Sequence, residues 1–175
     1  SLGMLAPLGF QLGAKLRPQF PSRGMRGECH HVLSPQALVP GEIPVLDIGC
    51  GHNFYVGVLN YAGYKAEGVG GEDLGSQYFY KKDVTTPLRP FGNPGPLRHV
   101  LSFEVGEHIP ADLDDGYLDN LARFGGDVLM SWAVPGQAGI GHINCKSNDW
   151  VIAQMEKRGL KYQHEKSMQL RSSIA

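Results

Sequence analysis

The pattern of hydrophobic and polar positions changes near residue 43. From there on, short apolar runs alternate with segments whose apolar residues recur at helical spacing. The apolar runs predict strands at residues 45–48, 66–69, 78–80, 99–103, 127–133 and 160–162, and the other segments predict helices at 54–61, 112–124 and 148–158. Alternating strands and helices are typical of a mostly parallel sheet with helices on both faces. We therefore predict an α/β domain over residues 44–175.

Residues 1–43 lack this pattern. Proline or glycine recurs every few positions, which predicts an extended N-terminal arm with at most short helical turns. Arg17, Arg23 and Arg26 are scattered through the arm. They could meet an acidic protein partner, so that the arm would serve in an assembly, but a solvated arm that has no partner is the favoured interpretation.

Composition narrows the class of protein. The 175 residues are 42% apolar and carry a net charge of −1, which argues against disorder and against a large polyanion-binding surface, without excluding RNA. No run approaches the roughly 18 apolar residues of a membrane-spanning helix. Cys29, Cys50 and Cys145 lack paired spacing, which favours a reducing compartment such as the cytoplasm or an organelle interior. The chain does not begin with Met, as expected of a processed or partial chain.

The first predicted strand of the domain runs into a glycine-rich turn. Residues 45–53 read Val-Leu-Asp-Ile-Gly-Cys-Gly-His-Asn, with an acid before Gly-x-Gly and a predicted helix directly after it. Glycine permits the sharp bend and lets a ligand approach the backbone. The segment resembles the nucleotide loop of class I S-adenosylmethionine-dependent methyltransferases, with Asn53 in place of the third glycine. The resemblance implies a Rossmann-like sheet. A tight turn without any ligand is the alternative.

The resemblance also implies how S-adenosylmethionine would be bound. Gly49 and Gly51 would approach its methionine part, and Asp47 would orient the loop or accept from the amino group. The full set of cofactor-binding residues that we predict from the resemblance is Asp47, Gly49, Cys50, Gly51, Asn53, Gly70, Glu72, Asp83, Val84, Phe103 and Glu104.

Four residues of this set concern the nucleoside. The family usually has a ribose-binding acid after the second strand, where this chain has Gly70, so that Glu72 or Asp73 would have to reach the ribose from further along. Asp83 and Val84 stand where the family has an acid and a small apolar residue that meet the adenine. Asp83 is also placed to close a simple turn before the next proline.

Residues 101–109 resemble the fourth-strand motif of many small-molecule and RNA methyltransferases. If the chain turns helical after Phe103, then Glu104, Glu107 and His108 share one helix face. The pattern resembles the metal-binding motif of small-RNA 2′-O-methyltransferases, in which a later histidine completes the site. His142 would take that place here, with Mg²⁺ or Zn²⁺ as the cation. The alternative is that Glu107 and His108 cap or pack the following helix and position the methionine end of the cofactor.

The segment at residues 132–144 leaves the fifth predicted strand at the ligand edge, where loops often line an acceptor pocket. Its His142 is a candidate general base or a buried hydrogen-bonding residue. We predict His108, His142 and Glu107 as the catalytic residues. Cys50 and Cys145 are expected to be inert, because no basic neighbours would activate them.

These patterns support two functions of different classes. The first is a methyltransferase that acts on an oxygen or nitrogen acceptor, with a small molecule favoured by the near-neutral charge. The second is a degenerate methyltransferase-like domain that serves as a structural subunit of a larger assembly, as the absent ribose acid and the long arm suggest. A nicotinamide-dependent oxidoreductase fits less well, because the later motifs would have no role in it.

One part of the family fold is missing from the predicted elements. Class I methyltransferases usually end in a seventh strand, antiparallel to its neighbours. The tail at residues 166–175 is polar and helical in pattern and does not supply such a strand. We therefore expect a truncated chain or a sheet that is one strand short.

Overall fold

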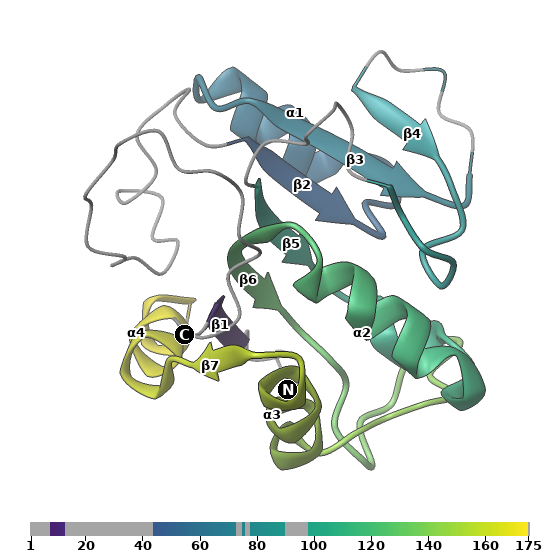
Figure 1. The fold of residues 1–175 in the computed structure, drawn as a ribbon, viewed down its shortest axis with the longest axis vertical. Helices are drawn as coiled ribbons and strands as arrows, with labels where there is room; N and C mark the ends of the chain where they lie inside the picture. Colours follow the sequence, from purple (N-terminus) through teal and green to yellow (C-terminus); the bar gives the residue numbers. More distant parts are fainter. Residues whose placement is uncertain (1–7, 13–43, 73–74, 76–77, 90–97, 175) are drawn as a thin grey trace.

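The computed structural model describes residues 8–12, 44–72, 75, 78–89 and 98–174. These residues form a seven-stranded sheet in the order β4-β3-β2-β5-β6-β1-β7 (Figure 1). Its strands are β1 (Leu8–Leu12), β2 (Val45–Ile48), β3 (Ala66–Gly70), β4 (Phe79–Lys81), β5 (Arg98–Ser102), β6 (Gly125–Met130) and β7 (Leu160–Tyr162). The helices are α1 (Phe54–Tyr61), α2 (Asp114–Ala122), α3 (Asn148–Lys157) and α4 (His164–Ile174), with short 3-10 turns η1 (Gly106–His108) and η2 (Ala111–Leu113).

Strands β2 to β6 are parallel to one another, which confirms the predicted mostly parallel α/β sheet. The central strand β2 is buried along its whole length. This explains why every residue of β2 except Asp47 is apolar, since a strand covered on both faces has no polar side. Because β2, β3, β5 and β6 run in one direction, the loops after them all leave at the same edge of the sheet. We call this the carboxyl edge.

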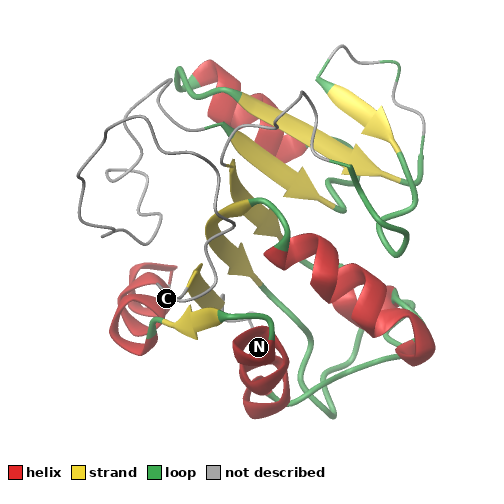
Figure 2. Ribbon diagram, viewed as in Figure 1, coloured by secondary structure: helices red, strands yellow, loops and turns green. Residues whose placement is uncertain are grey.

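Helices cover both faces of the sheet (Figure 2). The larger core lies between the sheet and helices α2 and α3, and includes Tyr117, Leu121, Trp132 and Met155. A smaller core lies under α1 on the other face, where Val56 packs among apolar residues of β2 and β3. Helix α3 begins and ends as its sequence indicates: Ser147 accepts from the backbone of Trp150 at 3.2 Å, and Gly159 follows with a φ of 84°. Among the described residues, no helix combines the length and apolarity that crossing a bilayer requires.

The antiparallel strand that the sequence did not reveal comes from the N-terminal part of the chain. Strand β1 lies between β6 and β7 and is antiparallel to both, with Phe10 opposite Val128 on one side and opposite Tyr162 on the other. The sheet is therefore not one strand short, and our expectation was wrong on that point. Residues 8–12 belong to the sheet rather than to an arm. The rest of the predicted arm lies outside the described residues, so the domain boundary at residue 43 stays a prediction.

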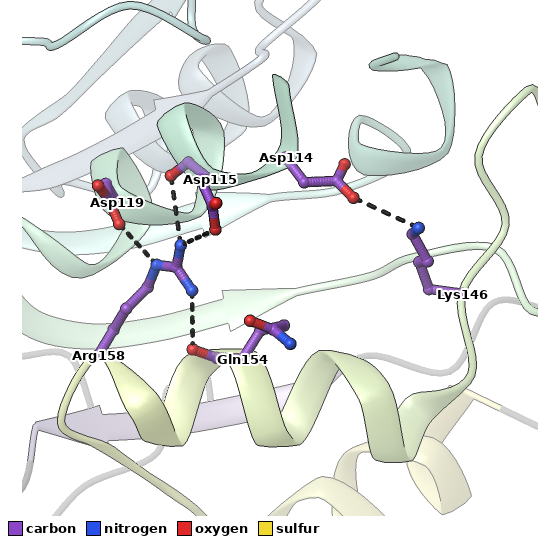
Figure 3. Close-up of polar contacts among 6 residues, drawn as sticks. All are labelled: Asp114, Asp115, Asp119, Lys146, Gln154 and Arg158. Atoms are coloured by element: carbon purple, nitrogen blue, oxygen red, sulfur yellow. Dashed lines mark hydrogen bonds and ion pairs between the residues drawn. The ribbon is translucent and has the colours of Figure 1, made fainter. Parts of the chain in front are cut away.

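Helices α2 and α3 are joined by an arginine at the end of α3. The Arg158 guanidinium donates to Asp119 Oδ1 at 2.7 Å, to Asp115 Oδ1 at 2.6 Å and to the carbonyl of Gln154 at 3.0 Å (Figure 3). Both carboxylates are largely exposed, so the ion pairs contribute little to stability. The ion pairs join the end of α3 to α2.

Candidate functional site

The glycine turn has the backbone that its sequence predicts. Gly49, Gly51 and Asn53 adopt φ values of 82°, 48° and 64°, all in the left-handed region. A Cβ atom at Gly49 would collide with the side chain of Val105, so glycine is required there for packing. A Cβ atom at Gly51 would meet nothing within 4 Å. The backbone at Gly51 is therefore open to the close approach of a ligand.

Asp47 is an unpaired acid beside this turn. Its side chain is 2% exposed, and its Oδ2 atom has no hydrogen-bond partner. Burial raises the pKa of the Asp47 carboxyl to about 7, because the ionised form is desolvated. A buried acid without a partner is costly. The carboxylate is thus poised to accept from a cationic or amide group that arrives at the turn.

The end of β3 carries no acid. Gly70 is the last residue of the strand, and Glu72 lies exposed two residues further on, while Asp73 is outside the described residues. A Cβ atom at Gly70 would make only ordinary contacts, the nearest at 3.6 Å to the ring of Phe79. Space for a larger side chain is therefore present. The nearby Glu67 is already engaged, since it pairs with Arg98 and accepts from Tyr80 Oη at 3.0 Å.

Asp83 closes the turn after β4. Its Oδ1 atom accepts from the backbone N–H of Thr85 at 2.8 Å and from the Thr85 hydroxyl at 2.7 Å. These hydrogen bonds lower the pKa of Asp83, so it is held as a carboxylate. The turn that we considered as an alternative is therefore present, with Val84 half-buried behind it. A role of Asp83 in binding adenine stays a prediction.

Helix α1 and the residue after β5 bring two aromatic rings together. The ring of Phe103 lies 5.2 Å from that of Tyr55, centroid to centroid. Cys50, in the turn between β2 and α1, is buried, and burial raises the pKa of its thiol to about 12. Such a thiol is inert at neutral pH, as expected.

Glu107, His108 and His142 come together at the carboxyl edge. One possible ligand atom from each of them lies within 4.8 Å of the other two, and the two imidazole rings meet edge to face at 5.2 Å. Glu107 is fully buried, and neither of its carboxylate oxygens has a hydrogen-bond partner. Burial is the main cause that raises the pKa of Glu107. We call these three residues the edge cluster.

Glu104 does not join the edge cluster, which corrects the fourth ligand of our predicted metal set. We assumed a helical turn after Phe103, but Glu104 has a φ of 59° and the 3-10 turn begins only at Gly106. Its carboxylate instead accepts from the Ser131 hydroxyl at 2.9 Å. The side chain is therefore tied to the residue after β6 and not to the histidines.

Hydrogen bonds indicate which ring nitrogen of His108 and of His142 carries the proton. His108 Nδ1 lies 3.0 Å from the carbonyl of Gly141, and His142 Nδ1 lies 3.4 Å from the carbonyl of Gln137. A carbonyl only accepts, so each Nδ1 must carry a proton. In the neutral imidazole each Nε2 is then left with its lone pair. The edge cluster therefore offers two basic nitrogens beside a buried carboxyl.

The loop that carries His142 is held to the η1 turn by hydrogen bonds that sequence reasoning did not find. The backbone N–H groups of Ile143 and Asn144 both donate to the carbonyl of Glu107, at 2.9 and 3.1 Å. The side-chain amide of Asn144 donates to Asp114 Oδ1 at 2.6 Å. The backbone carbonyl of Asn144 accepts from Trp132 Nε1 at 2.7 Å.

The carboxyl of Asp114 has a second partner. Lys146 Nζ lies 3.4 Å from its other oxygen (Figure 3). These partners lie far apart in the sequence, and no spacing pattern indicates that they meet. Together they fix His142 beside His108.

Comparisons with known proteins place the fold. An S-adenosylmethionine-dependent methyltransferase from Archaeoglobus fulgidus aligns with a TM-score of 0.50 at 16% identity, over 69% of this chain and 62% of that protein. The magnesium protoporphyrin IX methyltransferase of Synechocystis PCC 6803, solved with bound S-adenosylhomocysteine, aligns with a TM-score of 0.50 at 16% identity, over 69% of this chain and 67% of that protein. No protein-family model matches the chain, and no curated protein matches it in sequence. The chain has the fold of class I S-adenosylmethionine-dependent methyltransferases.

Proposed function

We propose that this protein is an S-adenosylmethionine-dependent methyltransferase that acts on an oxygen or nitrogen of a small molecule. The observation that carries the proposal is the meeting of two features at the carboxyl edge. The glycine turn touches Val105 through Gly49, and Val105 lies two residues before Glu107 of the edge cluster. A cofactor on the turn and an acceptor on the cluster would therefore be neighbours, and methyl transfer depends chiefly on such proximity.

The residues present fit the methionine end of the cofactor better than its ribose. At the methionine end, the unpaired Oδ2 of Asp47 matches the cofactor's ammonium group, and the open space at Gly51 admits the ligand to the backbone. When bound, S-adenosylmethionine supplies a methyl group carried on a sulfonium sulfur. At the ribose end, β3 finishes in Gly70 without a carboxylate. We therefore expect binding that is weaker than a complete ribose site would give.

The edge cluster supplies the acid–base chemistry. The free Nε2 of His108 or His142 would take the proton from an acceptor hydroxyl or ammonium group as its oxygen or nitrogen becomes a nucleophile. The buried Glu107 carboxyl would stabilise the imidazolium that forms, because it has no other partner.

A divalent cation is a second way to use the same residues. Two imidazole nitrogens and one carboxylate are a donor set that suits Zn²⁺ better than Mg²⁺, which prefers oxygen ligands and several waters. Such a cation would give the two unpaired Glu107 oxygens a partner and would lower the pKa of a bound hydroxyl. Elemental analysis of the purified protein and of Glu107→Gln tests this: a stoichiometric metal that the variant loses supports the cation, and metal-free protein that retains activity contradicts it.

The alternative function is that of a structural subunit. The absence of a carboxylate at Gly70 favours it, since a domain that no longer binds cofactor has no need of a ribose acid. The N-terminal residues would then serve assembly with a protein partner. Ligand binding separates the two functions.

Isothermal titration calorimetry with S-adenosylmethionine and S-adenosylhomocysteine at high micromolar concentration is the decisive experiment. We expect both ligands to bind. Gly51→Val should abolish binding, because its side chain enters the open space at the turn, at a cost in stability of about 1–2 kcal/mol for the left-handed backbone. Gly57→Ala is the matched control: it also meets open space, but on the outside of α1, and should bind as the parent does. If the parent protein binds neither ligand, the structural subunit is the favoured function.

A further inference from the structure

The segment between β6 and Asn144 exposes aliphatic side chains beside the edge cluster. We call residues 134–143 the edge loop. Within it, Val134, Ile140 and Ile143 are 38%, 98% and 67% exposed. Exposed aliphatic residues are ordinary when single, but two of these, Ile140 and Ile143, flank His142 of the edge cluster in sequence.

Ile140 is placed directly at the two histidines. Its neighbours in sequence are both glycines, and each lies against one of the rings. A Cβ atom at Gly139 would collide with the ring of His142, and one at Gly141 would lie 3.0 Å from His108 Nδ1. The backbone on both sides of Ile140 therefore borders the edge cluster, and the side chain between them is exposed to solvent.

The edge loop also carries no acidic residue, lysine or arginine. Residues 131–145 contain no Asp, Glu, Lys or Arg. The first cation after them, Lys146, is engaged by Asp114 at 3.4 Å and lies over the ring of Trp150 at 4.6 Å. A phosphate backbone is bound mainly through free lysine and arginine side chains. The edge loop offers it none.

We propose that the edge loop is the acceptor-binding surface and that its ligand is an uncharged, apolar molecule with one hydroxyl group, rather than a nucleic acid. The inference rests on the proposed methyltransferase function. The apolar body lies on Ile140 and Ile143, and the hydroxyl reaches Nε2 of His108 or His142. The hydroxyl oxygen forms the new C–O bond while the methyl–sulfur bond breaks, the electron pair of that bond stays on sulfur, and the hydroxyl proton passes to the imidazole nitrogen.

A homologous series of probes tests the apolar contact. Calorimetric titration with 4-ethylphenol, 4-butylphenol and 4-hexylphenol should show affinity that rises by up to about fourfold for each added methylene. The double variant Ile140→Ser/Ile143→Ser should reduce that gain to less than about 1.5-fold for each methylene. Tyr61→Ser is the control, because Tyr61 is 97% exposed on α1, away from the cluster, and its variant should keep the full gain. A double variant that keeps the full gain overturns the proposal.

Two further titrations test RNA as an alternative ligand and check that the double variant still binds the cofactor product. A fluorescein-labelled single-stranded RNA oligonucleotide at physiological salt should not bind; RNA binding that the double variant weakens would overturn the apolar acceptor. S-adenosylhomocysteine should bind the double variant as it binds the parent, since neither isoleucine belongs to the glycine turn. If the parent binds no S-adenosylhomocysteine, the methyltransferase function fails, whereas the alkylphenol series still decides whether the edge loop binds apolar hydroxyl compounds.

Discussion

The unpaired carboxyl of Asp47 makes cofactor binding depend on pH in a defined direction. Burial raises its pKa to about 7 in the free protein. A ligand ammonium group needs the ionised carboxylate, so below pH 7 the proton must leave before the ligand binds. The apparent affinity should then fall about tenfold for each pH unit below 7, and should be about 25-fold weaker at pH 5.5 than at pH 7.5.

Calorimetry with S-adenosylhomocysteine can measure both the affinity and the proton. At pH 6 about 0.9 proton should be released for each ligand bound, which buffers of different ionisation enthalpy would reveal. At the upper limit of pH 7.5 the larger part of the ligand α-amino group is still charged. The groups that interact electrostatically with Asp47 do not confuse the measurement, because the pKa of Cys50 is raised to about 12 and that of Tyr117 is also raised.

Asp47→Asn is the control for this reasoning. It removes the titrating group but keeps the size of the side chain, so its affinity should be lower and constant over the same pH range. A parent protein whose affinity does not change between pH 5.5 and 7.5, with no proton released, would show that Asp47 does not meet the ligand ammonium. An Asn variant that keeps the pH dependence would place its source elsewhere.

Three other substitutions test separate parts of the molecule. Gly70→Asp should tighten S-adenosylhomocysteine by about tenfold, because the position has room for a side chain and a carboxylate there would accept from the ribose; unchanged affinity in calorimetry would contradict this. Asp83→Ala should weaken S-adenosylmethionine and S-adenosylhomocysteine alike, since both carry the same adenine, and a loss confined to one ligand would refute the adenine role. Asp127→Asn should stabilise the fold by up to about 3 kcal/mol at pH 8 and by little at pH 4. Burial raises the pKa of Asp127 to about 6, from 3.8 in the unfolded chain. The protonated side chain therefore stabilises the fold fully below pH 3.8, and this stabilisation is lost as pH rises through 6. Equal urea midpoints for variant and parent at pH 8 would be evidence against that pKa.

Local sequence patterns predicted the elements whose causes are local. Strand β2 and helix α1 have the bounds that the apolar run and the glycine turn indicate. Helix α2 begins two residues later than predicted, because the chain makes the short 3-10 turn at Ala111–Leu113 first. Strand β1 was missed, since a run such as Leu8–Leu12 becomes a strand only through pairing with residues 128–130 and 160–162.

The candidate site shows the same division. The sequence indicates the left-handed turn at Asn53, because of the residue type there. The residue types of its later motifs also indicate that His108 and His142 converge. The sequence does not indicate the detachment of Glu104, because it depends on one backbone angle and on Ser131 from another strand. The contact between Asn144 and Asp114 likewise joins two loops that no short motif connects.

Strand β1 has a consequence for how the protein is made. It leaves the ribosome before every other described strand, yet its partners β6 and β7 are among the last to emerge. At about 5–20 residues per second, β1 waits roughly 8–30 seconds before β7 has been synthesised. During that interval its hydrogen-bonding edges are bare, and an unpaired edge recruits other chains readily. A nascent chain in which β1 is exposed over this interval is therefore more open to aggregation until β6 and β7 have been made.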